Sequence, residues 1–315
     1  MSDAANQSVR GVTCLVTGGA GFIGSHLCRG LVAGGARVRV LDDFSTGHRR
    51  NLPTGVDLFE GSVSDEGAVA RAVAGCGIVF HLAAMVSVPQ SVAEPDVCVR
   101  SNIIGTQRVL SGAKAAGVRR VVLASTCAVY GDQPSMPSRE GDQTTCCSPY
   151  AASKLAGEGL MQAFARTGGP STACLRFFNV YGPGQDPKSA YAAVISAFAS
   201  ALGEGRTPTI FGDGEQTRDF VFVEDVVRAV MLAGTSNAEL KGEVFNVGTG
   251  RRTSLLQLLG AMAKIAGRPG TADHKPARAG DVRHSQADIA RITRALGYEP
   301  RTRIEEGLER TLAAM

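Results

Sequence analysis

The sequence lacks several features that would place the chain in other functional classes. Its 315 residues contain no run of about 18 apolar residues, and the first ten residues lack the apolar centre of a signal peptide. We therefore expect a cytoplasmic protein that does not bind a membrane. The 33 Lys and Arg residues against 29 Asp and Glu residues leave a net charge of +4, which is too small to indicate nucleic-acid binding. Basic pairs such as Arg49-Arg50 are typical of solvated faces.

Cysteine and histidine give no metal or disulfide signal. The eight cysteines are scattered, with only Cys146 and Cys147 adjacent, so neither a Cys-x-x-Cys pair nor a secreted disulfide framework is present. We expect reduced thiols. The five histidines show no i, i+4 spacing, and no metal site is expected.

The chain is long enough, and apolar enough at 44% hydrophobic residues, to bury a large core and form two lobes. Apolar runs of strand length alternate with helical patterns. Strands are expected at Val12–Val16, Val38–Leu41, Ile78–Leu82, Val121–Ala124 and Ala173–Phe177, and helices at 24–33, 66–74, 99–116, 150–167 and 192–203. This alternation predicts an α/β fold with a doubly wound parallel sheet of the Rossmann type, buried on both faces.

A glycine-rich turn, Thr17-Gly-Gly-Ala-Gly-Phe-Ile-Gly24, joins the first expected strand to the first expected helix. Gly18 and Gly21 would permit a tight turn and close approach of a pyrophosphate, and Gly24 would permit close packing of helix on strand. The helix N-terminus would offer N–H groups to the anion. The glycine spacing is Gly-x-x-Gly-x-x-Gly, not the commoner Gly-x-Gly-x-x-Gly.

An acidic residue follows the second expected strand. Asp42 lies 18 residues beyond Gly24, where a carboxylate can accept hydrogen bonds from an adenosine ribose and repel a 2′-phosphate. The sequence therefore predicts NAD, not NADP, as the cofactor.

Tyr150 and Lys154 are four residues apart in an expected helix and would share one face. An ammonium there is expected to favour the phenolate and lower the pKa of Tyr150, as a general base near neutrality requires. Thr126 ends a strand, and ligands of such sheets bind at the carboxyl ends of strands. The alternatives are an exposed helical pair and a plain strand-end hydroxyl.

Taken in order, these motifs resemble the extended short-chain dehydrogenase/reductase superfamily, and within it the nucleotide-sugar epimerases and dehydratases. The resemblance covers nearly the whole chain. It is carried further by His81-Leu-Ala-Ala84, Ser125-Thr126, Val129-Tyr-Gly131, Arg176-Phe-Phe-Asn179-Val-Tyr-Gly-Pro183, Gly212-Asp-Gly214, Thr217-Arg-Asp-Phe220, Phe245-Asn-Val-Gly248 and Arg278-Ala-Gly-Asp281.

The resemblance implies a domain division and an assembly. Residues 1–178 would form the NAD-binding Rossmann domain, with 218–245 returning to it, and 179–315 would form most of a smaller, discontinuous substrate-binding lobe. A homodimer is the family expectation.

The resemblance also implies which residues bind the ligands. For NAD these are Gly18, Gly21, Phe22, Ile23, Gly24, Asp42, Ser62, Val63, Leu82, Ala83, Ala84, Tyr150 and Lys154. For the nucleotide sugar they are Ser87, Thr126, Asn179, Arg218, Arg278, Asp281 and Ser285. Ser62 stands where relatives often have an adenine-binding Asp. Arg218 and Arg278 are candidates for the diphosphate, and each has a solvated surface arginine as its alternative.

The implied mechanism assigns three catalytic residues. Tyr150 would remove a sugar hydroxyl proton while the hydride passes to NAD, Thr126 would hydrogen-bond the same oxygen, and Lys154 would hold the ribose. Return of the hydride to the other face of a rotated 4-keto sugar would invert the centre and regenerate the cofactor.

Residues 127 and 128 favour an epimerase. Dehydratases and decarboxylases of this superfamily usually carry an acid after the Ser-Thr pair, whereas this chain has Cys127 and Ala128. Cys127 is either a thiol acid or a small packing residue. The alternatives are a nucleotide-sugar dehydratase, including 5,6-dehydration, and a catalytically idle NAD-binding regulator.

Ser285 is a candidate determinant of which sugar the site accepts. In related hexose 4-epimerases this position lies beside C2, where a Tyr restricts the site to glucose and galactose and a small residue admits an acetamido group. Ser285 therefore predicts UDP-N-acetylglucosamine and UDP-N-acetylgalactosamine as substrates, with some activity on UDP-glucose and UDP-galactose. The alternative is that Ser285 faces solvent or a helix end.

Overall fold

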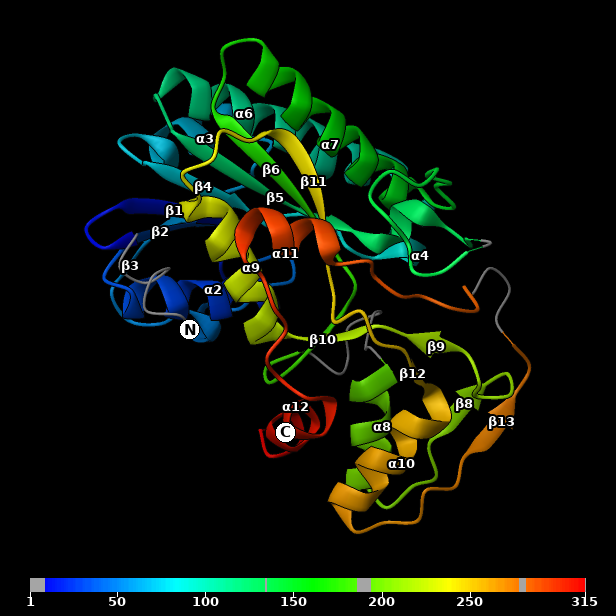
Figure 1. The fold of residues 1–315 in the computed structure, drawn as a ribbon. Coiled ribbons are helices and arrows are strands. Elements are labelled where there is room, and N and C mark those ends of the chain that lie inside the picture. Colours follow the sequence, from blue (N-terminus) through cyan, green and yellow to red (C-terminus); the bar gives the residue numbers. More distant parts are fainter. Residues whose placement is uncertain (1–8, 134, 186–193, 278–281, 315) are drawn as a thin grey trace.

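A seven-stranded, entirely parallel sheet forms the centre of the molecule in a computed structural model, which describes residues 9–133, 135–185, 194–277 and 282–314. The strand order is β11-β6-β5-β4-β1-β2-β3 (Figure 1). The strands are β1 (Thr13–Thr17), β2 (Arg37–Asp42), β3 (Val56–Glu60), β4 (Ile78–His81), β5 (Arg120–Thr126), β6 (Ser171–Phe177) and β11 (Lys241–Val247). The order reverses direction beside β1, the kind of position where doubly wound sheets bind ligands.

Helices cover both faces of this sheet (Figure 1). One face carries α3 (Glu66–Val73), α6 (Gly105–Ala115) and α7 (Pro149–Arg166), and the other carries α2 (Phe22–Ala33), α9 (Val223–Thr235) and α11 (Ala290–Leu296). Side chains from the strands alternate between the two resulting cores: Val16, for example, belongs to the α2 and α9 side and Leu15 to the α3 and α6 side. Burial on both faces explains why the strands read as continuous apolar runs.

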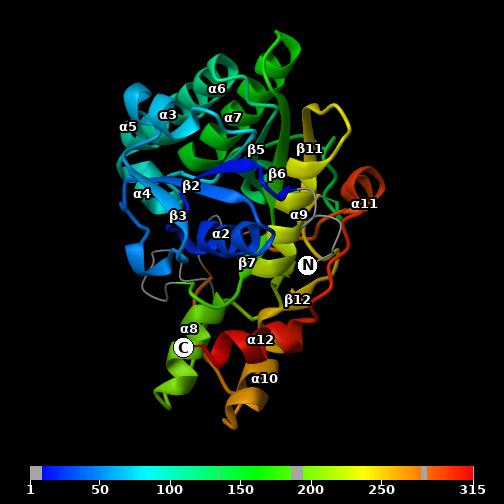
Figure 2. The same cartoon turned by 90° about the vertical axis from the view of Figure 1, so that its left-hand side faces the viewer.

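A third apolar cluster lies beyond the carboxyl ends of the strands, in the lower part of Figure 1 and of Figure 2. Ile195, Phe198, Leu258, Met262 and Leu308 form its centre. Its residues come from α8 (Val194–Gly203), α10 (Leu255–Ala266), α12 (Ile304–Leu312) and the short strands β7 (Asn179–Tyr181), β8 (Thr209–Phe211) and β10 (Phe220–Phe222). The same part of the molecule holds the short strands β9 (Thr217–Arg218), β12 (Thr253–Ser254) and β13 (Asp273–Lys275).

The remaining elements are short. They are the helices α4 (Val88–Ala93) and α5 (Pro95–Cys98), the 3-10 turns η1 (Arg49–Asn51) and η3 (Cys127–Tyr130), and the π-helical segment η2 (Val99–Ile104). Among the described residues, no helix combines the length and the apolarity that a membrane crossing requires.

The predicted fold class is confirmed, and all five expected strands exist with ends shifted by at most two residues. The expected helix at 99–116 is η2 followed by α6. Two sheet strands were not predicted. β3 has only partly buried or exposed residues, and β11 contains Asn246 and two charged residues, so neither shows the apolar run of a central strand.

Two segments from the second half of the chain, α9 and β11, pack on the central sheet and so concern the predicted domain division. α9 packs on α2 and on the sheet, and β11 pairs with β6 in parallel at the sheet edge. The division into 1–178 and 179–315, with 218–245 returning, stays a prediction.

Candidate active site

Segments that are far apart in the sequence lie close together at the carboxyl edge of the sheet. β1 runs into the glycine turn, β2 ends at Asp42, β4 runs into 82–84, and β5 ends at Thr126. Because all these strands are parallel and adjacent, their carboxyl ends lie along one edge. The fold therefore brings together the predicted cofactor and catalytic residues.

The glycine turn packs tightly against β2 and against the 82–84 segment that follows β4. Gly18 has φ +70°, and its N–H donates to the Leu41 carbonyl at 2.9 Å. A Cβ there would lie 2.7 Å from the amide nitrogen of Ala83. A Cβ on Gly24 would collide with the Gly18 carbonyl, so helix α2 reaches the turn only because residue 24 is glycine.

Gly21 has a different environment. A Cβ there would meet only the Gly18 carbonyl, at 3.3 Å, a tight contact that does not block the turn. Gly21 is the N-cap of α2, whose cap has no side-chain hydrogen bond and whose first turn has no acidic residue. Since the first N–H groups of a helix lack intrahelical partners, the amides of Phe22, Ile23 and Gly24 suit an anionic group such as the pyrophosphate of NAD.

Asp42 connects the turn to β2. Its Oδ2 accepts from the Ala20 N–H and its Oδ1 from the Phe44 N–H, both at 2.9 Å. Burial raises the pKa of this carboxyl, and the two N–H donors oppose the rise. Each carboxylate oxygen keeps a further lone pair, so Asp42 can also accept from a ribose hydroxyl.

The buried His81 connects β1, β4 and α6. It was not among the predicted site residues. His81 Nδ1 lies 2.7 Å from the Thr17 hydroxyl, and His81 Nε2 lies 3.0 Å from the Thr106 hydroxyl. The Ala83 N–H donates to the same Thr17 oxygen at 3.2 Å. Burial lowers the pKa of His81 to about 3, so the ring is neutral and fixes the start of the 82–84 segment.

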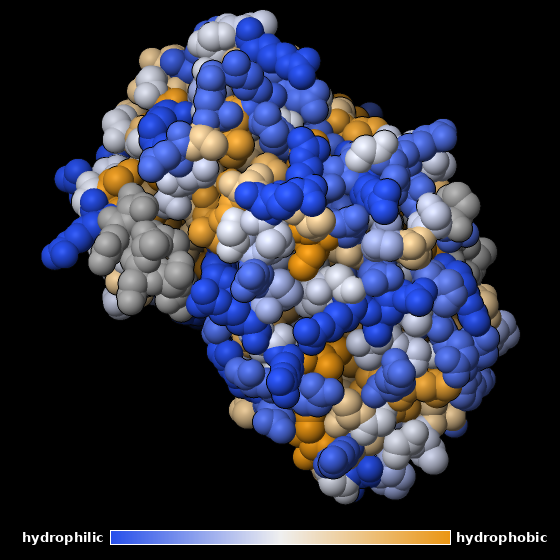
Figure 3. Space-filling model, viewed as in Figure 1, coloured by the Kyte–Doolittle hydropathy of each residue, from blue (hydrophilic) through white to orange (hydrophobic). Residues whose placement is uncertain are grey.

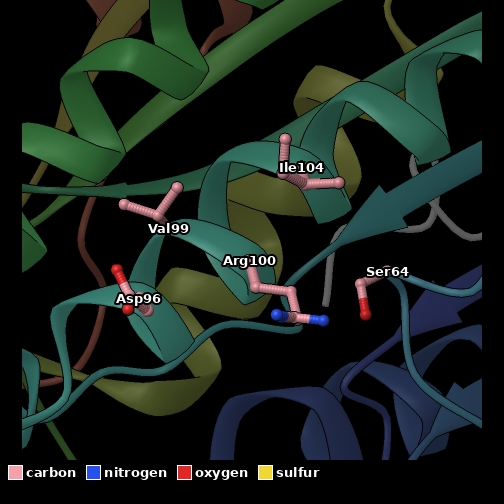
Figure 4. A pocket seen from close by; sticks show the side chains of 5 residues that line it. All are labelled: Ser64, Asp96, Val99, Arg100 and Ile104. Carbon is pink, nitrogen blue, oxygen red and sulfur yellow. The ribbon is translucent and has the colours of Figure 1, made fainter.

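The predicted adenine-side residues follow β3. The Ser62 and Ser64 hydroxyls are 3.1 Å apart, and Val63 is buried against Gly105, where a Cβ would lie 2.6 Å from a Val63 methyl. A hollow of about 380 Å³ lies beside them (Figure 4). In Figure 4 the Arg100 side chain extends from η2 towards Ser64.

Thr126 and Tyr150 are brought close together. Thr126 ends β5, Tyr150 opens α7, and the Thr126 hydroxyl lies close enough to the Tyr150 phenol to affect its pKa. Burial raises the pKa of Tyr150 to about 12, and the nearby Thr126 hydroxyl opposes this rise. The expectation that Lys154 lowers the pKa of Tyr150 is wrong for this structure.

The position of the Lys154 ammonium gives the physical reason. Its Nζ donates to the Ala124 carbonyl at 2.9 Å, so it is bound to the β5 backbone. Burial lowers the pKa of Lys154 to about 8. The residue is still on the predicted face of α7, but desolvation dominates the ionisation of both side chains.

Two polar residues that the sequence did not predict hold the start of α7. The Tyr150 N–H donates to the Ser91 hydroxyl at 3.1 Å. Asn102 donates to the Ser153 hydroxyl at 2.9 Å, and its amide also bonds both backbone groups of Met85. Asn102 lies within a π-helical segment, a feature often found at functional sites, but one sequence gives no signal for it.

The predicted sugar-side residues come from several elements. Ser87 caps α4 by accepting from the Gln90 N–H at 3.1 Å, and the Asn179 N–H donates to the Asp219 carbonyl at 3.0 Å. Arg218 is half-buried in β9 and donates to the Thr217 carbonyl at 2.9 Å. Arg278 and Asp281 lie outside the described residues.

Ser285 lies close to Cys127, the residue that follows β5. Its N–H donates to the Thr217 carbonyl at 3.1 Å, and its side chain lies close to the Cys127 thiol, next to Thr126. Burial raises the pKa of Cys127 to about 11, so the thiol is neutral near pH 7.

The Asp219 carboxylate is close enough to Cys127 to raise the pKa of the thiol. All of its hydrogen-bonding capacity is used by other groups. Its oxygens accept from the Thr249 N–H and hydroxyl at 2.8 and 2.6 Å, and from the N–H groups of Gly250 and Ala287 at 2.9 and 3.1 Å. Four donors saturate a carboxylate, so Asp219 holds the 248–250 turn and has no lone pair left for proton transfer.

A doubly wound sheet with a glycine turn, an acid at the end of β2 and a Thr-Tyr-Lys group at the sheet edge is typical of one class, the dinucleotide-dependent enzymes that oxidise and reduce an alcohol carbon. The chain matches the NAD dependent epimerase/dehydratase family over residues 14–248. It belongs to that family.

The most similar proteins agree with this assignment. A UDP-glucose 4-epimerase of Mycolicibacterium smegmatis is 41% identical, covering 95% of this chain and 96% of that protein. The UDP-N-acetylglucosamine 4-epimerase of Methanobrevibacter ruminantium, solved with UDP-N-acetylmuramic acid, has a TM-score of 0.92 at 34% identity, covering 97% and 98% of the two chains. The UDP-glucose 4-epimerase of Thermotoga maritima, solved with UDP-glucose, has a TM-score of 0.91 at 40% identity, covering 96% and 98%. The predicted family, enzyme class and NAD cofactor are confirmed.

Proposed function

We propose that the chain interconverts UDP-N-acetylglucosamine and UDP-N-acetylgalactosamine, and UDP-glucose and UDP-galactose at a lower rate, by transient oxidation at C4. The observation that carries the proposal is the placement of Tyr150 close to Thr126 at the carboxyl edge of the sheet, one helical turn from Lys154.

The chain's own groups would move one proton. Tyr150 takes it from the sugar hydroxyl and returns it later, and Thr126 holds the same oxygen. Bound NAD would supply the acceptor of the hydrogen from C4, and its positive charge would favour ionisation of Tyr150. Lys154 as an ammonium would donate hydrogen bonds to the ribose.

The surroundings of Thr126 favour epimerisation over dehydration. Elimination of water needs a further acid or base beside the ketone. Ala128 has no ionisable group, burial raises the pKa of the Cys127 thiol, and Asp219 is saturated by four donors. Proton transfer between Tyr150 and the C4 oxygen requires none of these groups. The intact Thr126, Tyr150 and Lys154 also favour an enzyme over an idle NAD-binding regulator.

The contact between Ser285 and Cys127 supports the choice of sugar. It puts a small side chain one residue from Thr126, where a bulky residue would crowd a rotating keto sugar. The solved relative from Methanobrevibacter ruminantium is named for an N-acetylated sugar, whereas the relatives from Mycolicibacterium smegmatis and Thermotoga maritima are named for glucose.

The test is incubation of the purified protein with UDP-N-acetylglucosamine, UDP-N-acetylgalactosamine, UDP-glucose and UDP-galactose. We expect products of unchanged mass and inverted C4, fastest for the acetylated pair. Loss of water or of carbon dioxide would replace this function with dehydration or decarboxylation. Nucleotide released on denaturation should be NAD.

An exposed apolar surface supports the proposed homodimer. Val92, Val97, Val99 and Ile104 are 62%, 45%, 44% and 42% exposed. They lie on α4, α5 and η2, which are neighbours in Figure 2 and all pack on α7. The face shown in Figure 3, by contrast, is mostly hydrophilic, with apolar residues in separate spots. The cytoplasmic location expected from the sequence stays a prediction.

A further inference from the structure

A buried carboxylate on α7 binds two strands of the sheet. Glu158 Oε1 accepts from the Ser125 hydroxyl at 2.6 Å and from Arg176 Nε at 2.9 Å, and Glu158 Oε2 accepts from Arg176 Nη2 at 2.7 Å. The Arg176 and Glu158 side chains are each only 4% exposed. Ser125 on β5 and Arg176 on β6 are register partners, so one carboxylate binds neighbouring positions of adjacent strands.

Glu158 shares a helix face with the catalytic groups. Tyr150, Lys154 and Glu158 follow at intervals of four along α7. They contact the last three residues of β5: Tyr150 lies close to Thr126, Lys154 bonds the Ala124 carbonyl, and Glu158 bonds Ser125 between them. A rotation or sliding of α7 relative to β5 would therefore disturb the Glu158 bonds and the placement of Tyr150 together.

The charge on Glu158 is balanced within the network. Arg176 also lies over the Tyr130 ring, 4.8 Å from its centroid, and the Tyr130 hydroxyl donates to Asn246 at 2.6 Å. Ion pairs of this kind are often replaceable by apolar residues without loss of stability, since burying both charges costs about what their attraction returns. Stability alone therefore gives little reason for a charged pair here, whereas the directional bonds fix one helix position.

We propose that Ser125, Glu158 and Arg176 form a positioning clamp that aligns Tyr150 and Lys154 with Thr126 for proton transfer. None of the three needs to touch the sugar. The clamp rests on the proposed function, because alignment matters only if Tyr150 and Thr126 act on one oxygen.

The test uses a matched pair of variants of the full-length protein. Ser125→Ala removes the link between β5 and the clamp and leaves the Glu158–Arg176 ion pair in place. Thr172→Val removes a hydroxyl of the same kind, which donates from β6 to the α7 carbonyl of Met161 at 2.9 Å, far along the helix from Tyr150. Both variants lose one buried bond between a strand and α7.

The two variants should differ in catalysis but not in stability. We expect similar small decreases in Tm for both. Ser125→Ala should lower kcat at least fivefold with KM and bound NAD within twofold of wild type, and Thr172→Val should keep kcat within twofold. A Ser125→Ala kcat within twofold of wild type, or an equal loss in Thr172→Val, overturns the clamp.

Hydrogen exchange separates failure of the clamp from failure of the proposed function. If wild type epimerises no UDP-hexose, the proposed function fails, and exchange of the α7 amides near Tyr150 then decides the clamp. Faster exchange in Ser125→Ala than in Thr172→Val supports it, and equal exchange overturns it.

Discussion

Tyr150 is protonated near neutrality in this structure, because burial raises its pKa to about 12. We predict that Tyr150→Phe lowers kcat at least 100-fold, since general acid–base catalysis contributes about 10²–10⁴-fold. The ring stays in place, so Tm and bound NAD should change little. The measurement is steady-state epimerisation with a thermal melt as control. Near-normal turnover would remove Tyr150 from the mechanism.

The ionisation of Lys154 predicts how kcat/KM changes with pH. Its pKa is lowered to about 8, so its ammonium is present below that pH and is lost as the pH rises through it. If the ammonium holds the ribose, kcat/KM should fall as the pH rises through about 8. A Lys154→Arg variant keeps its charge at higher pH and should show no such limb, whatever its absolute rate. An unchanged limb in that variant would assign it to another group.

Ser285 tests the choice of sugar. We predict that Ser285→Tyr suppresses turnover of the N-acetylated pair and spares UDP-glucose and UDP-galactose, because the added ring would occupy space beside C2. The measurement is kcat/KM for both pairs. Ser285→Ala is the control: it removes the hydroxyl near Cys127 without adding volume and should keep turnover of the acetylated pair within about tenfold, since one hydrogen bond contributes about 0.5–1.5 kcal/mol. Equal losses on both pairs in Ser285→Tyr would reject the gatekeeper role.

At the scale of elements, the glycine turn fixes where α2 begins. Gly24→Ala would drive a Cβ into the Gly18 carbonyl and push the helix N-terminus away from the anion site. We predict at least a tenfold loss of NAD affinity, measured by isothermal titration of the NAD-free protein. Gly260→Ala in α10 is the matched control, because a Cβ there meets nothing within 4 Å and alanine favours a helix by about 1 kcal/mol. It should retain affinity and gain stability. Unchanged affinity in Gly24→Ala would contradict the role given to the turn.

The catalytic helix shows how far an element could be predicted. The spacing of Tyr150 and Lys154 gave the shared helix face, and Pro149 at the first helical positions with Ser148 as N-cap fits where α7 begins. The expected pKa change of Tyr150 failed because spacing along a helix does not reveal that Lys154 is bound to Ala124 on another element.

At the scale of the whole molecule, the apolar surface on α4, α5 and η2 predicts association. We expect wild type to sediment as a dimer and Val99→Glu to shift towards monomer, since a charge there would be desolvated in the interface. Leu256→Glu, on α10 and 37% exposed, is the control and should stay dimeric. A monomeric wild type at micromolar concentration would reject the homodimer.

The sequence by itself determined the features that depend on local pattern. Apolar runs alternating with helices gave the parallel sheet, and glycine spacing before a helix, with an acid after the second strand, gave the NAD site. Only the tertiary structure decided which polar groups share a site. Ser91 reaches the Tyr150 amide, Asn102 reaches Ser153, and Glu158 binds Ser125 and Arg176, across separations of 18 to 59 residues for the bonds between elements. A hydrogen bond or a desolvated charge depends on the distance in space, and that distance is set by how the helices pack on the sheet.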